Sequence, residues 1–94
     1  MDGYSTVPAD EINGFSVIAS AILDTQTRLI LAEGFRDDGP SGFRLIYVVS
    51  TAPVENDGYS GWHNGTYFDG LNSRTNKAGG RAEFARRLAE RWND

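Results

Sequence analysis

The stretch FRLIYVV, residues 43–49, decides the fold of this chain. Successive side chains of a β-strand point to opposite faces, and here both sets of positions are apolar beyond Arg44. This pattern is typical of a strand that is buried on both sides, or covered by a helix on one of them. The stretch therefore predicts a central strand over residues 42–51.

The segment before this strand predicts a strand that pairs with it. Residues 36–42, RDDGPSG, are rich in turn residues and lead straight back into residues 42–51.

Residues 15–36 fit two patterns of secondary structure. Apolar residues between 12 and 23 follow helical spacing, which predicts a helix over about residues 10–23. Alternatively, residues 24–27 form a turn between two apolar, β-branched runs, and we favour this hairpin.

The favoured hairpin also predicts a register. A three-residue loop would place Asp24 opposite Arg28, with Leu23 opposite Leu29 beyond them. Opposite charges beside the turn and an apolar pair above it stabilise such a hairpin.

The sequence WHNGTYF, residues 62–68, carries a strong turn signal. Asn64-Gly65 between aromatic residues is typical of a type I′ turn, because both central residues of that turn need a positive φ. The pattern predicts a hairpin with Trp62 facing Tyr67.

A helix is expected at the end of the chain, from about residue 78 to residue 92. Phe84, Leu88 and Trp92 form one apolar stripe at helical spacing. Gly79-Gly80 is a poor helix start and indicates a hinge or a loop end. The predicted fold is a single α+β domain over residues 1–94, with an antiparallel meander sheet of four to five strands packed against one C-terminal helix.

The first thirteen residues are expected to form a loosely ordered N-terminal arm. Val7-Pro8 followed by acidic residues could start one helical turn, which Asn13-Gly14 would end. No core element is predicted here.

Charge and composition narrow the classes of function. The net charge is −4, divided as ten acidic residues against three arginines in residues 1–73 and six basic against three acidic in residues 74–94. An acidic total argues against a dedicated nucleic-acid binder. The absence of cysteine and the acidic, polar start predict a cytoplasmic protein. Residues 15–23, the longest apolar-rich stretch, are too few to span a membrane.

No motif for catalysis or cofactor binding stands out. His63 is the one histidine, and the lack of cysteine excludes a thiol nucleophile or a soft metal site. The acidic residues at 37–38 and 55–57 do not match a calcium loop, and the glycines match no phosphate-binding motif. We therefore predict no enzyme activity, no metal and no cofactor, with His63 on the surface of a strand.

Four aromatic residues within ten positions are the remaining signal: Tyr59, Trp62, Tyr67 and Phe68. On a two-faced hairpin, Trp62 and Tyr67 point one way while Tyr59 and Phe68 point the other. One pair can join the core under the helix. The other pair is exposed, covered by the N-terminal arm, or free to bind a partner, and the sequence leaves open which face this is.

These observations predict a small, non-catalytic module that binds a partner protein. Tryptophan and tyrosine dominate the energetic centres of protein interfaces. The predicted site therefore has Trp62 and Tyr67 as anchors, with Tyr59 and His63 beside them, and Arg87 and Arg91 at its rim. By analogy with small acidic cytosolic proteins of phage or bacterial origin, the module would be an inhibitor or adaptor that occludes its partner.

Two other classes of function stay open at this point. The arginine-rich C-terminal helix would suit a nucleic-acid-associated accessory protein. An enzyme, or a subunit that completes one, would use His63 and nearby acidic residues. The oligomeric state is also open, a homodimer included.

Overall fold

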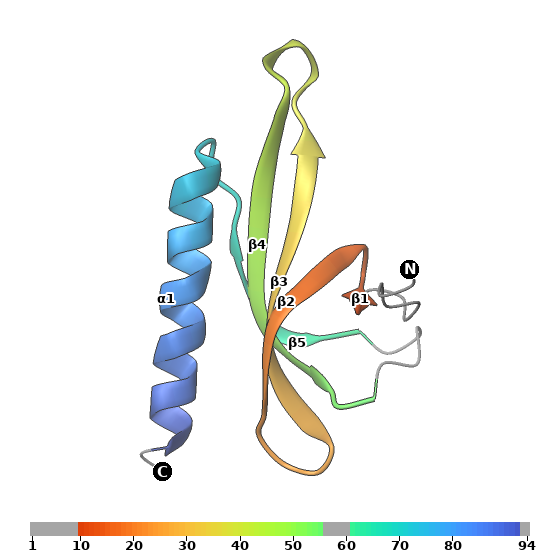
Figure 1. The fold of residues 1–94 in the computed structure, drawn as a ribbon, viewed down its shortest axis with the longest axis vertical. Helices are drawn as coiled ribbons and strands as arrows, with labels where there is room; N and C mark the ends of the chain where they lie inside the picture. Colours follow the sequence, from red (N-terminus) through yellow and green to blue (C-terminus); the bar gives the residue numbers. More distant parts are fainter. Residues whose placement is uncertain (1–9, 56–60, 93–94) are drawn as a thin grey trace, which may run out of the picture.

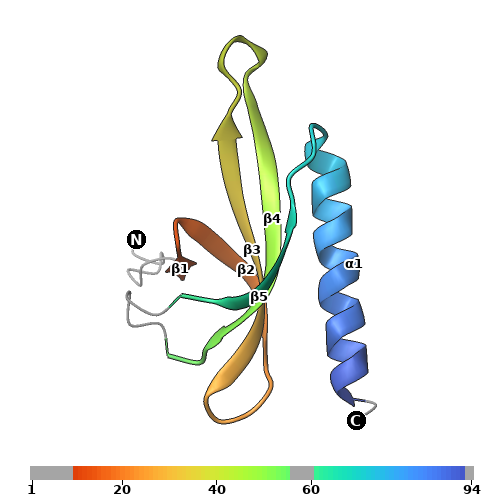
Figure 2. The same ribbon diagram turned by 180° about the vertical axis from the view of Figure 1, so that it is seen from behind.

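The structure is a computed structural model, and it describes residues 10–55 and 61–92. One antiparallel sheet curls beside a long helix that runs along one of its faces (Figures 1 and 2). The elements in chain order are β1 (Glu11–Ile12), β2 (Phe15–Ile22), β3 (Thr27–Asp37), the 3₁₀ turn η1 (Gly39–Ser41), β4 (Phe43–Pro53), β5 (His63–Phe68) and α1 (Ser73–Trp92). The strands are hydrogen-bonded in the order β1-β2-β3-β4-β5. The predicted α+β class and meander order are confirmed.

Residues 15–36 form strands, as favoured over the helix, but the predicted register is wrong. Ile22 pairs with Arg28 and Ala21 with Leu29, so the strands are shifted by two residues. The reason is that the Asp24 carboxylate accepts hydrogen bonds from the backbone N–H groups of Gln26 and Thr27. With the hydrogen bond from the N–H of Leu23 to the carbonyl of Thr27, this Asx-type turn places the loop at residues 24–26, one residue earlier than predicted. A shift of two residues keeps every side chain on its expected face.

The side chain of Arg28 finds its partner elsewhere. Its Nη1 lies 2.6 Å from Oδ2 of Asp10, and its Nε donates to the carbonyl of Pro53. The guanidinium is buried, so this pair ties the start of the described chain to the end of β4.

Part of the expected N-terminal arm is ordered in the sheet. Residues 1–9 lie outside the described part of the chain, but Glu11–Ile12 form β1 and Ile12 is buried. Asn13 and Gly14 join β1 to β2 with φ values of 54° and 83°. This is a two-residue type I′ turn. The expectation that residues 1–13 add nothing to the core is therefore wrong for Ile12.

The central strands are buried on both faces, as the stretch at 43–49 predicted. On the face away from α1, the core comprises Ile12, Ile30, Ala32, Val48 and Ala52, with Phe15, Val17 and Trp62 packed against it. On the helix face, it comprises Leu29, Leu31, Tyr47 and Val49, with Phe68, Phe84 and Leu88 among the residues packed against it. The sheet curls so that β1 and the start of β5 come together around the first cluster (Figures 1 and 2). Complete burial of one valine, leucine or isoleucine side chain in these clusters stabilises the fold by about 1.5–3 kcal/mol.

The helix begins five residues before the predicted start, at Ser73, and Gly79-Gly80 lie inside it. These glycines let α1 approach the sheet closely. A Cβ at Gly79 would lie 2.7 Å from the ring of Phe68, and one at Gly80 would lie 3.1 Å from Cβ of Tyr47. The interpretation of this pair as a hinge is therefore wrong. Further along α1, Phe84 and Leu88 pack on the sheet as expected, while the side chain of Trp92 lies outside the described part.

The predicted type I′ hairpin at Asn64-Gly65 is also wrong. Both residues lie within β5, which pairs with β4. Asn64 has a φ of 58°, but Gly65 is not in the left-handed region. The pairs Val49↔Thr66 and Thr51↔His63 leave two residues of β5 opposite Ser50 alone. The dipeptide therefore forms a β-bulge, for which a left-handed residue is well suited.

Candidate functional site

The hairpin formed by β3 and β4 extends beyond the rest of the sheet. Pairing of β2 with β3 ends at Glu33, and pairing of β5 with β4 ends at Tyr47. Beyond these positions the two strands pair with each other as far as Asp37 and Phe43. The hairpin tip projects past the start of α1 (Figures 1 and 2). Residues 35–43, here named the hairpin tip, therefore form a convex protrusion.

Two phenylalanines stand on one face of the hairpin tip. Phe35 and Phe43 are 70% and 71% exposed. Their ring centroids are 5.7 Å apart and the rings are nearly perpendicular, at 86°. Such an edge-to-face pair is favourable in itself and limits the motion of both rings. The protein thus presents two large apolar side chains to water, packed edge to face against each other.

The turn between the phenylalanines is held by local hydrogen bonds. The N–H of Asp38 donates to the carbonyl of Gly42, and the N–H of Gly42 donates to the carbonyl of Gly39. The carboxylate of Asp37 accepts from the N–H of Gly39. Gly39 and Gly42 have φ values of 67° and 91°, which favour glycine. The backbone of the hairpin tip is therefore well defined.

The opposite face of the β3–β4 hairpin is charged at the hairpin tip and directly beside it. Arg36 and Arg44 are paired residues on neighbouring strands, where like charges repel. Asp69, just after β5, lies 3.3 Å from Nη2 of Arg44 and 3.9 Å from Nη1 of Arg36. Asp38 lies 3.6 Å from Nε of Arg44. The two carboxylates offset the repulsion, and Asp69 connects the hairpin tip to the body of the domain.

The base of the hairpin is fixed by the first turn of α1. Past the end of β5, the N–H of Leu45 donates to Oγ of Ser73, 2.8 Å away. The carbonyl of Leu45 accepts from Nδ2 of Asn76, 2.9 Å away. Asn76 is buried and also bonds the N–H and the carbonyl of Gly70. Side chains of the helix thus replace the missing strand partner of β4.

The predicted anchors Trp62 and Tyr67 lie on the same face, as expected, although the hairpin that was to pair them does not form. Trp62 Nε1 donates to the hydroxyl of Tyr67, 3.1 Å away, and the ring of Trp62 lies 5.3 Å from that of Phe15. Trp62 is half-buried against the core, whereas Tyr67 is 54% exposed. Phe68 lies on the other face, under α1. Trp62 therefore has a packing role in the domain.

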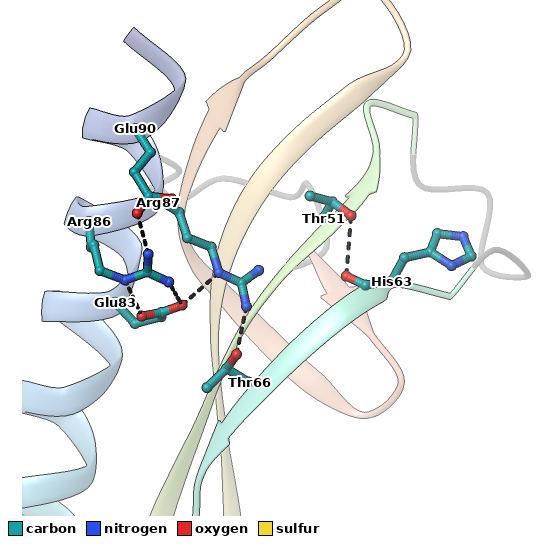
Figure 3. A network of polar contacts seen from close by, with 7 residues as sticks. All are labelled: Thr51, His63, Thr66, Glu83, Arg86, Arg87 and Glu90. Carbon is teal, nitrogen blue, oxygen red and sulfur yellow. Dashed lines mark hydrogen bonds and ion pairs between the residues drawn. The ribbon is translucent and has the colours of Figure 1, made fainter. Parts of the chain in front are cut away.

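The other predicted residues of this region do not join a polar cluster. His63 is exposed on β5, and its side chain points away from the polar network drawn in Figure 3. Its backbone carbonyl accepts a hydrogen bond from Oγ1 of Thr51. Tyr59 lies outside the described residues. The partner-binding roles assigned to Trp62, His63, Tyr67 and Tyr59 stay predictions.

Arg87, predicted at the rim of the site, instead connects α1 to β5. Its Nη2 donates to Oγ1 of Thr66 at 2.6 Å, and its Nε donates to Oε2 of Glu83 at 2.8 Å (Figure 3). Glu83 also accepts from Arg86, which reaches Glu90 as well. These hydrogen bonds lower the pKa of Glu83 to about 2, with that from Arg86 contributing most.

This network predicts a pH dependence of stability. The pKa of Glu83 in the folded protein, about 2, is below its ordinary value of 4.5, so its charged form stabilises the fold fully above pH 4.5. The stabilisation is lost as the pH falls through about 2. Glu83→Gln should lower the unfolding free energy by about 1 kcal/mol at neutral pH, and this difference should shrink in acid. Chemical denaturation at a series of pH values measures it. Glu90→Gln, at an exposed position, is the control, and an equal pH dependence in both variants would contradict the prediction.

Arg91 is exposed and lies beside a shallow groove between α1 and β2. The groove has a volume of about 380 Å³ and is lined by Ala21, Ile22, Leu23, Leu88 and Arg91. Nη2 of Arg91 is 3.5 Å from the carbonyl of Leu23. Arg91 lies on α1, whereas Trp62 packs on the opposite face of the sheet, so the predicted residues that the structure describes do not form one surface.

The sequence reasoning did not identify Phe35 and Phe43 as surface residues. Phe43 continues the apolar alternation of residues 45–49 and Phe35 ends the largely apolar run of residues 29–35, so both resemble core residues in sequence. The available signal was their position on either side of a turn rich in Asp, Gly and Pro, because the ends of long strands can extend past the elements that cover them.

Within the described ranges, no group of three or more metal-ligating side chains is close enough to hold an ion. None of the helices in those ranges combines the length and the apolar character needed to cross a membrane. Comparisons with protein-family models, curated proteins and solved structures gave no match. The fold and the site define a small α+β domain with a projecting aromatic hairpin.

Proposed function

We propose that this protein is a non-catalytic module that binds a partner protein through the hairpin tip. The observation that carries the proposal is the exposed, edge-to-face pair of Phe35 and Phe43 on a braced protrusion. Leaving two such rings in water gives up the free energy of burying them, so their burial against a partner would be favourable. The partner is expected to offer an apolar recess that accepts two aromatic rings.

The form of the site supports a protein partner. A convex wedge fits a concave surface, and rigid aromatic anchors lose little conformational entropy on binding. The charged face with Arg36, Arg44 and Asp69 lies behind the rings, where it would form a polar rim. Insertion of the hairpin tip would act by occlusion, as expected of an inhibitor or adaptor. We place this action in the cytoplasm, in keeping with the absence of cysteine.

A nucleic-acid partner has less support. Arg86 and Arg87 on α1 are both bonded to Glu83, and Arg86 also to Glu90. These carboxylates reduce the positive field that attracts phosphates. An enzyme that depends on His63 also has less support, because its side chain is exposed and turned away from the polar network near it (Figure 3).

The experiment is site-specific photo-crosslinking followed by affinity measurement. A photo-reactive phenylalanine analogue at position 43 should crosslink a protein in extracts of the native host, and the same analogue at exposed position 67 should not. The identified partner is then titrated with Phe35→Ala and Phe43→Ala. Each substitution should weaken binding by about 30-fold, mainly through faster dissociation.

Tyr67→Ala is the matched control, since it also truncates an exposed aromatic side chain. It should bind normally, and urea denaturation should show that all three variants are still folded under the conditions of the binding measurement. The proposal is wrong if the partner binds both phenylalanine variants normally. Loss of binding in Arg87→Glu, together with a salt-dependent shift with DNA or RNA, would favour the nucleic-acid function instead.

A further inference from the structure

The described strands leave more than half of the outer edge of β2 without a partner. β1 pairs with Phe15 and Ser16, and the N–H of Val17 donates to the carbonyl of Asp10. From residue 18 to residue 22 no described strand lies beside this edge. Residues 15–23 also contain no charged residue and no proline. Proteins usually protect an exposed edge with such residues, so an unprotected edge indicates that another strand covers it.

The direction of the backbone groups along this edge follows from the hydrogen bonds at its two ends. The N–H of Val17 points away from β3, whereas that of Leu23 donates to Thr27 and points toward it. The irregularity between Val17 and Ala19 accounts for the change. Because the direction alternates along a strand, the N–H and C=O groups of Ser20 and Ile22 point outward. Both residues are exposed.

We propose that a second copy of this chain covers the edge, with its own β2 paired antiparallel about a two-fold axis at Ala21. In this register Ser20 lies opposite Ile22 of the partner subunit, and Ile22 lies opposite the partner's Ser20. Each of the two pairs exchanges two hydrogen bonds. All four outward groups of each protomer are then bonded, and the two sheets become one continuous sheet.

The side chains of the segment are complementary to themselves in the same register. Ile22, which is 64% exposed, faces the small Ser20 of the partner subunit. Leu23 faces the partner's Ala19, and Ala21 meets the partner's Ala21 at the axis. On either side of the axis large side chains thus oppose small ones, and at the axis two small side chains meet, which suits a self-complementary two-fold interface. A foreign peptide would need to reproduce this pattern by chance, so the second copy is the better occupant.

The helix side of the interface supports the same arrangement. The groove beside β2 is lined by Ala21, Leu23 and Leu88 on the face where α1 lies. In the dimer, the partner's Ala21 and Leu23 lie on this same face of the continuous sheet, next to the groove. Each protomer would therefore cover apolar surface of the other in addition to forming the strand pair.

The test uses the full chain and measures its mass in solution over a range of concentrations, by light scattering and sedimentation. We expect a dimer. Ser20→Pro removes an outward N–H without breaking a bond to β3, since proline is tolerated at such edge positions. It should raise the dimer dissociation constant by about 30-fold or more. Ile22→Lys gives a second variant should Ser20→Pro fail to fold, and it should also favour the monomer.

Ile18→Lys is the control, because it adds the same charge to β2 at a position that faces Asp24 of the partner subunit in this register. It should remain a dimer. Amide hydrogen exchange identifies the interface, since Ser20 and Ile22 should be protected in the wild type and exchange freely in Ile22→Lys. Three outcomes would overturn the proposal. The wild type could be monomeric at all concentrations, or the dimer could persist in both Ser20→Pro and Ile22→Lys. The third outcome is a foreign protein bound at the edge of a monomer.

Discussion

Replacement of Gly80 by valine should lower the free energy of unfolding by about 3 kcal/mol. Gly80 is buried in α1, and a Cβ there would lie 2.9 Å from Cδ1 of Leu31 and 3.1 Å from Cβ of Tyr47. The Leu31 methyl could rotate away, but Cβ of Tyr47 is fixed to the backbone of a central strand. The helix would have to move outward, and this would loosen the contacts of Phe84 and Leu88 with the sheet.

The matched control is Ala82→Val, which places the same β-branched side chain on the exposed side of the same helix. It should cost about 0.6 kcal/mol, the intrinsic difference between alanine and valine in a helix. Urea denaturation of both variants gives the comparison. Equal effects of the two substitutions would mean that α1 does not approach the sheet as closely as the structure shows.

The glycine pair also explains why the start of the helix was predicted too late. Each glycine inside a helix costs about 1 kcal/mol relative to alanine, so local propensity places Gly79-Gly80 outside it. The compensation comes from packing against Tyr47 and Phe68, which are distant in sequence. Propensity along the chain contains no information about such a contact.

The two Asn-Gly dipeptides show the same limit. Asn13-Gly14 forms the tight turn that was predicted for Asn64-Gly65, and the latter lies in a strand. The dipeptide itself permits a positive φ in both places. Which of the two dipeptides becomes a turn depends on its pairing partners, and residues 63–68 pair with β4 across a connection of nine residues, 54–62. The alternation at 43–49 was more informative, because a strand that is buried on both faces has to lie in the interior of the sheet.

The candidate site was harder to predict than the fold for a related reason. Apolar alternation identifies the residues that can be buried, but it does not show where the covering elements end. Phe35 and Phe43 are exposed because β2 and β5 stop short of them. Trp62, by contrast, meets Phe15 because the sheet curls. Both outcomes depend on the three-dimensional shape of the sheet.

The hairpin tip is a suitable binding device because its base is held by side chains of α1. Ser73 and Asn76 bond the N–H and the carbonyl of Leu45 at the point where β5 has ended. Without them, two groups of β4 would face solvent or remain unbonded, and the hairpin could bend at Leu45. Stability of the helix start and presentation of Phe43 are therefore coupled.

This coupling makes Asn76→Ala the second substitution with a large expected effect, about 3 kcal/mol of unfolding free energy. The side chain of Asn76 donates to the carbonyls of Leu45 and Gly70 and accepts from the N–H of Gly70. Truncation removes these partners from three backbone groups in a part-buried site, and each lost hydrogen bond costs about 1 kcal/mol. Water that enters the space left by the amide would recover part of this lost free energy.

Asn72→Ala is the control for Asn76→Ala. Asn72 is exposed and caps the same helix by accepting from the N–H of Thr75, so its loss should cost about 1 kcal/mol. Thermal and urea denaturation measure both variants, and amide exchange should be faster over residues 35–45 in Asn76→Ala alone. If the two variants are equally stable and exchange alike in the hairpin, the side chain of Asn76 does not brace the hairpin tip. The rigidity that the proposed binding surface requires would then have to come from Asp69 and its two arginines.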